Sequence, residues 1–192
     1  MTAHIAGVDP SLTGCGLAHI TAEGLVQTWV KGTDPLPKTA TPGEVSARLS
    51  EIVGWLFSRD LNLINANTVL AVVEGPAHGA LYGQPHERAG LFWRILNGFC
   101  VRGVPVAVMN PTTAKAYIAG HGRADKADVR RAVAAAWPGQ GLARIDDNQA
   151  DAVALATAGV DWVGWPGPWL EGRRGAKSIL SARWPDRATV RA

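Results

Sequence analysis

An unbroken apolar run over residues 68 to 73 constrains the fold of this chain more than any other feature. The run reads Thr-Val-Leu-Ala-Val-Val and is followed at once by Glu74-Gly75-Pro76. Six residues without polar alternation are typical of a strand that is covered on both faces. Such a strand lies in a sheet with helices above and below it, so the run predicts an α/β fold.

The rest of the chain supplies the other layers of this fold. Residues 4 to 8, 15 to 20 and 25 to 31 have the pattern of three strands in direct succession, which predicts an antiparallel meander. The later strands are separated by helices, which favours parallel, right-handed crossovers. We therefore expect a mixed five-stranded sheet flanked by helices. After the meander we expect a helix with its apolar face from Val45 to Leu56, the strand at 68 to 73, a helix from Pro85 to Val101, a strand from Val104 to Met109, a short helix after Pro111, and helices from Lys126 to Trp137 and from about Asn148 to Val160.

Length and charge divide the chain into a body and an appendage. The 192 residues fit one domain, which we place at residues 1 to 162, followed by a Trp-containing basic extension at 163 to 192. Residues 172 to 192 hold six basic residues against one acidic residue, a charge of +5, whereas the preceding residues carry −2. Such a segment attracts polyanions, but solvated basic tails without a partner are also common.

Composition argues against a membrane or secreted protein. No apolar run approaches the roughly 18 residues of a membrane span, so we expect no membrane partner. The N-terminus lacks the pattern of a secretory signal. Cys15 and Cys100 form no metal-ligand spacing. Two isolated cysteines favour reduced thiols and a cytoplasmic location.

Acidic residues end two of the predicted strands. Asp9 closes the first strand and Glu74 closes the strand at 68 to 73. If these strands are parallel neighbours, the two carboxylates face one another and repel unless a cation lies between them. Asp147 and Asp151 are four residues apart at a helix start, so they share one helical face. Oxygen ligands from two strands and a helix suit Mg²⁺ or Mn²⁺, and the spacing of Cys and His argues against zinc.

Each acid also has an ordinary structural explanation. Asp9 precedes Pro10 and suits a turn, Glu74 could face solvent at a strand end, and Asp146 or Asp147 could cap a helix. The coincidence of all these acids favours a site. The loop from Gly7 to Gly16 contains several glycines, which leaves little side-chain bulk around Asp9.

At this level of detail the chain resembles a known family. Gly7-Val-Asp-Pro-Ser-Leu-Thr-Gly-Cys-Gly16, Val73-Glu74, Lys115, Gly120-His-Gly-Arg-Ala-Asp-Lys126 and Ala150-Asp-Ala-Val-Ala-Leu-Ala156 resemble the RuvC-type Holliday-junction resolvases in order and spacing. The resemblance covers roughly residues 3 to 160. It implies an RNase H-like fold, in which a meander is followed by helix-separated strands.

The resemblance also implies roles for individual residues. Asp9, Glu74 and Asp151 correspond to metal ligands, and Lys115 and Lys126 to lysines near the scissile phosphate or the DNA backbone. The further residues that we expect to contact DNA are Arg123, His78, Tyr82, Arg173 and Arg174.

Two departures from the family pattern bear on the site. The last two acids of the family are three residues apart, but Asn148 stands three residues before Asp151. We favour Asp147 as the fourth carboxylate, which adds it to the expected catalytic set of Asp9, Glu74, Asp151 and Lys115, with Asn148 as an accessory metal ligand that could take its place. The aromatic residue that follows the strand-end Glu by three positions in bacterial members is Ala77 here, and His78, Leu81 or Tyr82 could substitute for it.

The family mechanism implies two-metal phosphodiester hydrolysis, with two Mg²⁺ or Mn²⁺ ions per active site and four-way DNA junctions as the substrate. A junction offers two equivalent strands, so we expect a homodimer, with the helix from Pro85 to Val101 at its interface. The location would be the cytoplasm of a bacterium or of a phage-infected host, and the altered acid spacing favours a phage member.

Three other functions share some of these sequence features. An actin-like ATPase shares a similar Gly-Val-Asp hairpin but needs two lobes, for which 192 residues without a repeat are too few. A non-catalytic binder of branched DNA would lack one or more of the metal acids. Another RNase H-like nuclease that cuts flaps, replication forks or RNA:DNA hybrids is separated from a resolvase only by the family motifs.

Overall fold

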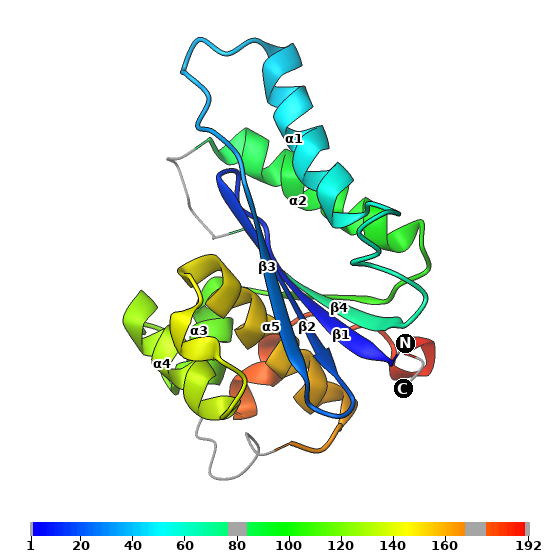
Figure 1. The fold of residues 1–192 in the computed structure, drawn as a ribbon, viewed down its shortest axis with the longest axis vertical. Helices are drawn as coiled ribbons and strands as arrows, with labels where there is room; N and C mark the ends of the chain where they lie inside the picture. Colours follow the sequence, from blue (N-terminus) through cyan, green and yellow to red (C-terminus); the bar gives the residue numbers. More distant parts are fainter. Residues whose placement is uncertain (1, 77–83, 168–175, 191–192) are drawn as a thin grey trace.

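The computed structural model describes residues 2–76, 84–167 and 176–190, and its centre is a five-stranded sheet (Figure 1). The strands are β1 His4–Asp9, β2 Gly14–Thr21, β3 Val26–Gly32, β4 Thr68–Glu74 and β5 Val106–Met109. Their order is β3-β2-β1-β4-β5. The first three strands pair antiparallel, whereas β4 pairs parallel with both β1 and β5. The predicted mixed sheet is confirmed.

Helices cover both faces of this sheet. The helices are α1 Pro42–Leu56, α2 Pro85–Cys100, α3 Pro111–Ala119, α4 Lys126–Ala136 and α5 Asp147–Val163. In Figure 1, α1 and α2 lie on one side of the sheet and α3, α4 and α5 on the other. Each of α1, α4 and α5 starts with a capping box, as at Thr41 and Glu44, and the two reciprocal hydrogen bonds fix where the helix begins.

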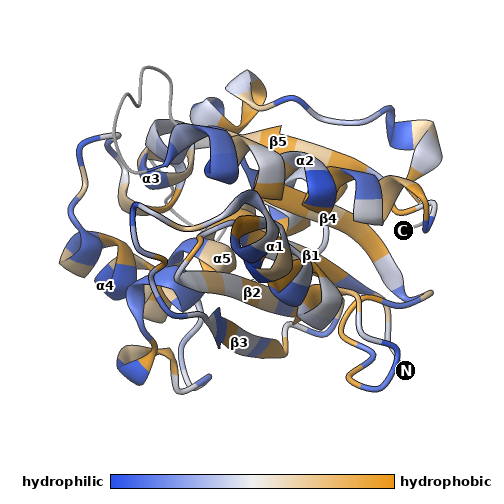
Figure 2. Cartoon of the chain, turned by 90° about the horizontal axis from the view of Figure 1, so that it is seen from above, coloured by the Kyte–Doolittle hydropathy of each residue, from blue (hydrophilic) through white to orange (hydrophobic). Residues whose placement is uncertain are grey.

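The alternation of side chains along β1 builds a separate core on each face. Ile5 points to the core beneath α5, and Ala6 and Val8 point to the core beneath α1 and α2. Figure 2 shows the hydrophobic residues of the strands most plainly on β4 and β5. On α2, Leu91, Phe92, Ile95 and Phe99 are all buried against the sheet. The apolar stripe of this helix therefore serves the chain's own core and leaves Trp93, 66% exposed, on the outer side.

Glycine allows α5 to lie directly on β1. A Cβ atom added to Gly7 would lie 2.0 Å from the carbonyl oxygen of Ala152, a separation that no side chain tolerates. The close approach brings the first turns of α5 to the end of β1. Because residue 7 is a glycine, α5 packs close enough to β1 for the start of the helix to lie beside the strand ends.

The described part of the C-terminal extension packs on the body of the protein. Arg183 forms two backbone hydrogen bonds of 2.9 Å with Val108 and so adds one antiparallel bridge to the edge of β5. The Trp184 ring stacks on the Trp162 ring at 4.9 Å between centroids, and the Arg187 guanidinium lies 4.7 Å from the Trp162 ring centroid. These contacts hold the described part of the extension against β5 and Trp162.

None of the helices in the described part of the chain combines the length and the apolar character that a membrane span requires.

Candidate active site

The register of the sheet brings the two strand-end acids together. Val8 pairs with Val73 in the parallel ladder of β1 and β4, so Asp9 and Glu74 end neighbouring strands at the same edge. Their side chains lie close enough for each carboxyl group to shift the pKa of the other. Asp9 is buried rather than placed in a solvated turn. The acids therefore meet as the sequence predicted.

Helix α5 adds a third carboxyl group at this edge. Asp151 lies one turn into α5 and interacts electrostatically with both Asp9 and Glu74. Gly16, the partner of Asp9 in the β1–β2 ladder, makes this approach possible. A Cβ atom on Gly16 would lie 2.2 Å from the carbonyl oxygen of Asn148, so a larger residue would push the start of α5 away.

Burial and mutual repulsion disfavour the charged forms of these carboxyl groups. Burial, and then the charge of Asp151, raise the pKa of Asp9 to about 7. Burial, followed by the charge of Asp9, raises the pKa of Glu74 well above its usual value. Burial also raises the pKa of Asp151, while the nearby Lys115 opposes that shift. Such a group of carboxyl groups favours a bound proton or a nearby cation.

Asp147 and Asn148 lie at the start of the same helix but have different neighbours. Asp147 forms ion pairs with Lys126, at 2.9 Å between Nζ and Oδ2, and with Arg130, at 3.5 Å between Nε and Oδ1. The Asn148 side chain instead packs on β2, where a Cβ atom on Gly14 would lie 2.6 Å from its Nδ2 atom. Asp146, not Asp147, is the helix cap, because its side chain accepts a 2.8 Å hydrogen bond from the Gln149 backbone N–H.

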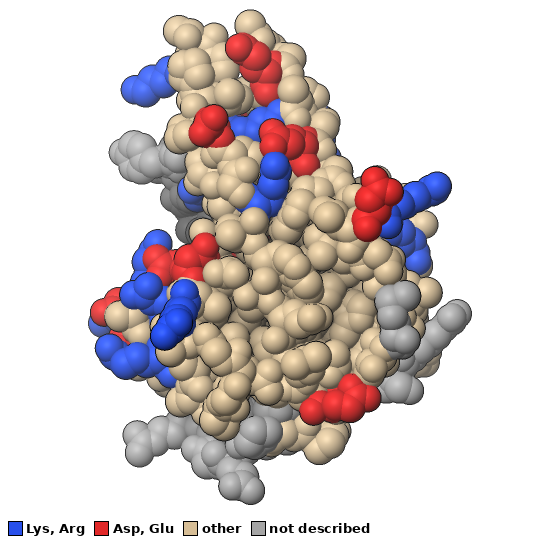
Figure 3. All heavy atoms as spheres, viewed as in Figure 1, with Lys and Arg blue, Asp and Glu red and all other residues tan. Residues whose placement is uncertain are grey.

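Basic residues of α3 and α4 flank the acids. Lys115 of α3 opposes the raised pKa of Glu74 and of Asp151, and exposed Lys126 of α4 opposes that of Asp9 and of Asp151. Figure 3 shows Lys and Arg side chains gathered over α4 beside acidic ones. Arg123 is exposed in the turn before α4, and no contact of its side chain with the acids is found among the described residues. Of the other expected DNA contacts, His78, Tyr82, Arg173 and Arg174 lie outside the described residues.

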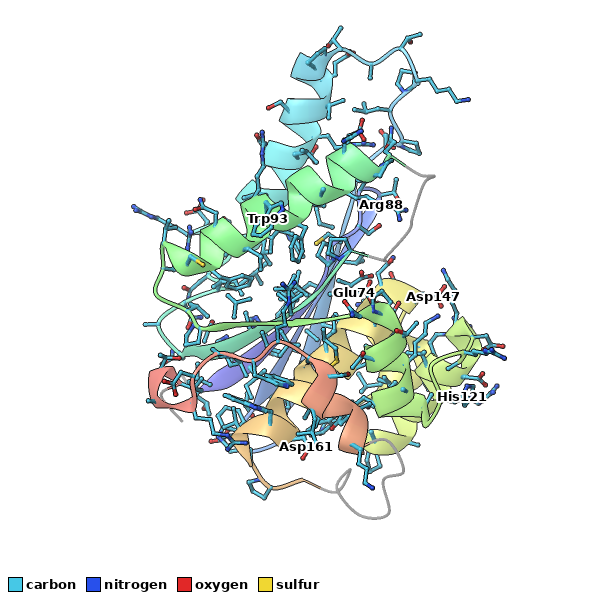
Figure 4. All side chains as sticks on the ribbon, turned by 180° about the vertical axis from the view of Figure 1, so that it is seen from behind. Glu74, Arg88, Trp93, His121, Asp147 and Asp161 are labelled. Atoms are coloured by element: carbon cyan, nitrogen blue, oxygen red, sulfur yellow. The ribbon has the colours of Figure 1, made fainter. Side chains whose placement is uncertain are left out.

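Two basic residues of the site were missed by the sequence analysis. Arg130 reaches Asp147 from α4. Arg88 lies near the start of α2, and its positive charge opposes the raised pKa of Asp9 from the other wall of the site. Figure 4 shows Arg88 and Glu74 on opposite sides of the gap between α2 and the strand ends. A single arginine in a helix carries no spacing signal, so nothing in the sequence pointed to Arg88.

The acids meet without forming a finished metal cage. Within the described residues, no three His, Cys, Asp or Glu side chains converge closely enough to ligate one ion in their present positions. The donor set nevertheless suits a hard divalent cation, because three carboxyl groups lie together at the strand ends and interact electrostatically. A cation would offset the repulsion between their charged forms.

Comparison with known proteins places this architecture in one family. No family model matches the chain. The crossover junction endodeoxyribonuclease RuvC of Frankia casuarinae is 32% identical over 183 residues, which cover 90% of this chain and 95% of the relative. The RuvC of Moorella thermoacetica is 30% identical over 173 residues, 84% of this chain and 93% of the relative.

Solved structures share the fold. Thermus thermophilus RuvC superposes with a TM-score of 0.65 at 24% identity, over 86% of this chain and 99% of that one. The yeast mitochondrial Holliday junction resolvase Ydc2 gives a TM-score of 0.54 at 13% identity, over 97% and 82%. Two bacterial relatives are 32% and 30% identical to this chain over most of its length, and the sheet and the acids at its strand ends agree with them. The chain therefore belongs to the RuvC family of crossover junction endodeoxyribonucleases.

Proposed function

We propose that this protein is a metal-dependent endonuclease that resolves four-way DNA junctions by paired phosphodiester hydrolysis. The observation that carries the proposal is the meeting of Asp9, Glu74 and Asp151 at one edge of the sheet, flanked by Lys115 and Lys126. The relatives are named crossover junction endodeoxyribonucleases, and T. thermophilus RuvC, with a TM-score of 0.63 to this chain, is known in complex with a Holliday junction substrate.

The carboxylates would hold Mg²⁺ or Mn²⁺, with two ions in each site. Asp9, Glu74 and Asp151 are the proposed ligands, Asp147 is the favoured fourth, and Asn148 is an accessory that could replace it. Bound divalent cations supply a water of lowered pKa and stabilise the negative charge on the leaving 3′ oxygen. The products would carry a 5′ phosphate.

The protein's own residues would do three things around this reaction. Asp9 and Glu74 would fix the position of the bound cations, because β1 and β4 each pair with a strand on both sides. Lys115 would neutralise the charge that develops on the phosphorus centre or the leaving group. Lys126, held by Asp147, would bind a neighbouring phosphate, and exposed Arg123 would extend this basic rim.

An assay with four substrates tests the function. Labelled four-way junction, flap, duplex and RNA:DNA hybrid are incubated with the protein, with and without Mg²⁺. We expect Mg²⁺-dependent, symmetric nicks in the junction alone. Preferred cutting of the flap or the hybrid would favour another RNase H-like nuclease, and junction binding without cutting would indicate a non-catalytic binder of branched DNA.

We further propose a two-fold symmetric homodimer that uses α2. Because the buried face of α2 serves the chain's own core, the interface would be its outer side, where Trp93 and Val101 are 66% and 69% exposed. Trp93→Glu should convert a dimer into a monomer without loss of helical signal, measured by light scattering and circular dichroism. A monomeric mass of the unmodified protein at micromolar concentration, with junction cutting intact, would contradict the dimer.

Cellular location, source and domain division are further points of the proposal. We propose that the protein acts in the cytoplasm of a bacterium or of a phage-infected cell. A phage origin rests on the spacing of Asp147, Asn148 and Asp151 alone, whereas the two relatives described above come from bacteria. The domain division at residue 162 also stays a prediction, since the described residues beyond it pack against β5 and Trp162.

A further inference from the structure

A small pocket lies beside Glu74, between the first turns of α2 and the start of α3. Its volume is about 140 Å³, and its walls include four prolines and one aromatic ring together with two charged side chains: Pro10, Pro76, Pro85, Pro111, Phe92, Glu74 and Arg88. Prolines and one aromatic ring make these walls stiff and apolar, so Glu74 and Arg88 are the only ionic side chains among the described residues that line the pocket. Of the proposed metal ligands only Glu74 lines this pocket, and neither Lys115 nor Lys126 is among its described lining residues.

Arg88 is the cation of this pocket and lacks a partner. Its guanidinium group forms no ion pair or hydrogen bond with any other described residue, and the side chain is exposed. Its charge still acts on buried Asp9, so the group is directed toward the acids without being bound to them. Figure 4 shows it facing the site from α2. An arginine in this position is available to an anion that enters between α2 and the strand ends.

The turn that carries Arg88 is fixed by an unusual anchor. Gln84, which caps α2, has a left-handed backbone with φ 59° and ψ 61°, a conformation that is unfavourable for residues other than glycine. Arg48 of α1 is buried and donates a 3.0 Å hydrogen bond from a terminal nitrogen to Gln84 Oε1, while its Nε atom has no partner. Burying a cation for one neutral hydrogen bond is unfavourable for stability, so this contact is better explained as holding the start of α2 in place.

We propose that Arg88 binds a phosphodiester group of the cleaved strand next to the scissile phosphate, opposite Lys115 and Lys126. This inference rests on the proposed nuclease function. The planar guanidinium group matches two phosphate oxygens, and the apolar pocket walls suit the face of the adjoining deoxyribose. The strand would then pass between two cationic walls with the acids at the bottom of the gap, so its register on the acids is set from both sides.

The test compares two arginines that differ in position only. Arg88→Gln removes the proposed contact, and Arg59→Gln removes the same charge from the exposed connection between α1 and β4, beyond the opposite end of β4. Junction binding is measured with EDTA present over a range of salt concentrations. We expect Arg88→Gln to weaken binding about tenfold near 0.1 M salt and to lower the log–log salt slope by about one, with Arg59→Gln unchanged.

A second measurement separates phosphate binding from simple neutralisation of Asp9. Arg88→Lys keeps the charge but loses the two-oxygen geometry, so it should recover the salt slope and only part of the affinity. If Arg88 acts on the carboxyl groups alone, Arg88→Gln will leave metal-free binding and its salt slope unchanged, and the proposal fails. If the unmodified protein neither binds nor cuts a junction, the proposed function fails instead, so the two failures are distinguishable.

Discussion

The two ends of β1 both bury ionisable side chains, but different contacts disfavour their charged forms. At the C-terminal end, burial and neighbouring carboxylates raise the pKa of Asp9 to about 7. At the N-terminal end, burial lowers the pKa of His4, and burial with the neighbouring His4 lowers that of His19 to about 3. The His4 and His19 rings stack with centroids 4.1 Å apart, and His4 Nε2 lies 2.8 Å from Thr68 Oγ1.

The difference shows how a packing device differs from a site that requires a ligand. Neutral imidazoles stack without repulsion, and the edge of Trp29 completes the cluster at 4.7 Å from His19. The carboxyl groups at the other end repel as soon as they ionise, and cations on two walls surround them. A hollow of about 400 Å³ at the histidine end exceeds the pocket beside Glu74, yet no Lys, Arg, Asp or Glu lines it. Chemistry therefore identifies the site here, and size does not.

The largest expected effect is the loss of cleavage when a ligand is removed from the acid end of β1, which is the C-terminal end with Asp9, Glu74 and Asp151. Asp9→Asn, Glu74→Gln and Asp151→Asn should each reduce Mg²⁺-dependent junction cleavage by at least about a thousandfold, because each removes charge that holds the cations. Junction binding, measured by gel shift with EDTA, should change little, since the phosphate contacts lie on other residues. Retained Mg²⁺-dependent cutting by any of the three variants would overturn the ligand assignment.

The matched control comes from the histidine end of the same strand pair. His19→Gln alters a buried ionisable residue at the far end of β2 from Gly16, and we expect its cleavage rate to equal that of the unmodified protein. A comparable loss of cleavage in this variant would mean that damage to the sheet, rather than loss of a ligand, explains the acid variants.

A smaller effect, about a tenfold change in the Mg²⁺ requirement, would show whether Asp147 or Asn148 is the fourth metal ligand. If Asp147 is the fourth ligand, Asp147→Asn should raise the Mg²⁺ concentration for half-maximal cleavage about tenfold and Asn148→Ala should raise it less, because a lost charge weakens divalent binding more than a lost amide. The reverse order would assign the position to Asn148.

Lys126→Gln is the control for this comparison, because Asp147 also pairs with Lys126. If Asp147 only holds that lysine, Asp147→Asn and Lys126→Gln will weaken metal-free DNA binding equally, and neither will shift the Mg²⁺ requirement.

The sequence predicted the acid end better than the contacts around it, for physical reasons. Asp9 and Glu74 were predictable because parallel neighbouring strands end at one edge, and the apolar run at 68 to 73 required such strands. The ion pairs of Asp147 depend on how α4 packs against α5, which no local pattern encodes. The stacking of Trp184 on Trp162 could likewise not be predicted, because an irregular segment has no periodic pattern that shows which side chains are buried.

The cluster of His4, His19 and Trp29 was missed for a related reason. Its residues come from three strands, and only the register of the meander brings them together. In the sequence, each of these side chains is an isolated polar or aromatic residue on a strand.

The smallest expected effect is a tilt in the pH dependence of stability, opposite at the two ends. Asp9 titrates near 3.8 when unfolded and near 7 when folded, so its contribution to the free energy of unfolding falls as pH rises between these values. His19 titrates near 6.5 when unfolded and near 3 when folded, so its contribution falls as pH decreases through the same range. In the unmodified, metal-free protein the two slopes oppose each other between about pH 4 and 6.5.

Single variants should expose each slope in thermal melts with EDTA. Relative to the unmodified protein, the Tm of Asp9→Asn should rise by roughly 10 °C from pH 4 to pH 7, and that of His19→Gln should rise similarly as pH falls from 6.5 to 4. Mg²⁺ should cancel the first tilt, because a cation replaces the proton at the acid end, and should leave the second unchanged. Equal tilts with and without Mg²⁺ would show that the two ends of β1 differ in packing alone, and that the carboxyl groups hold no metal.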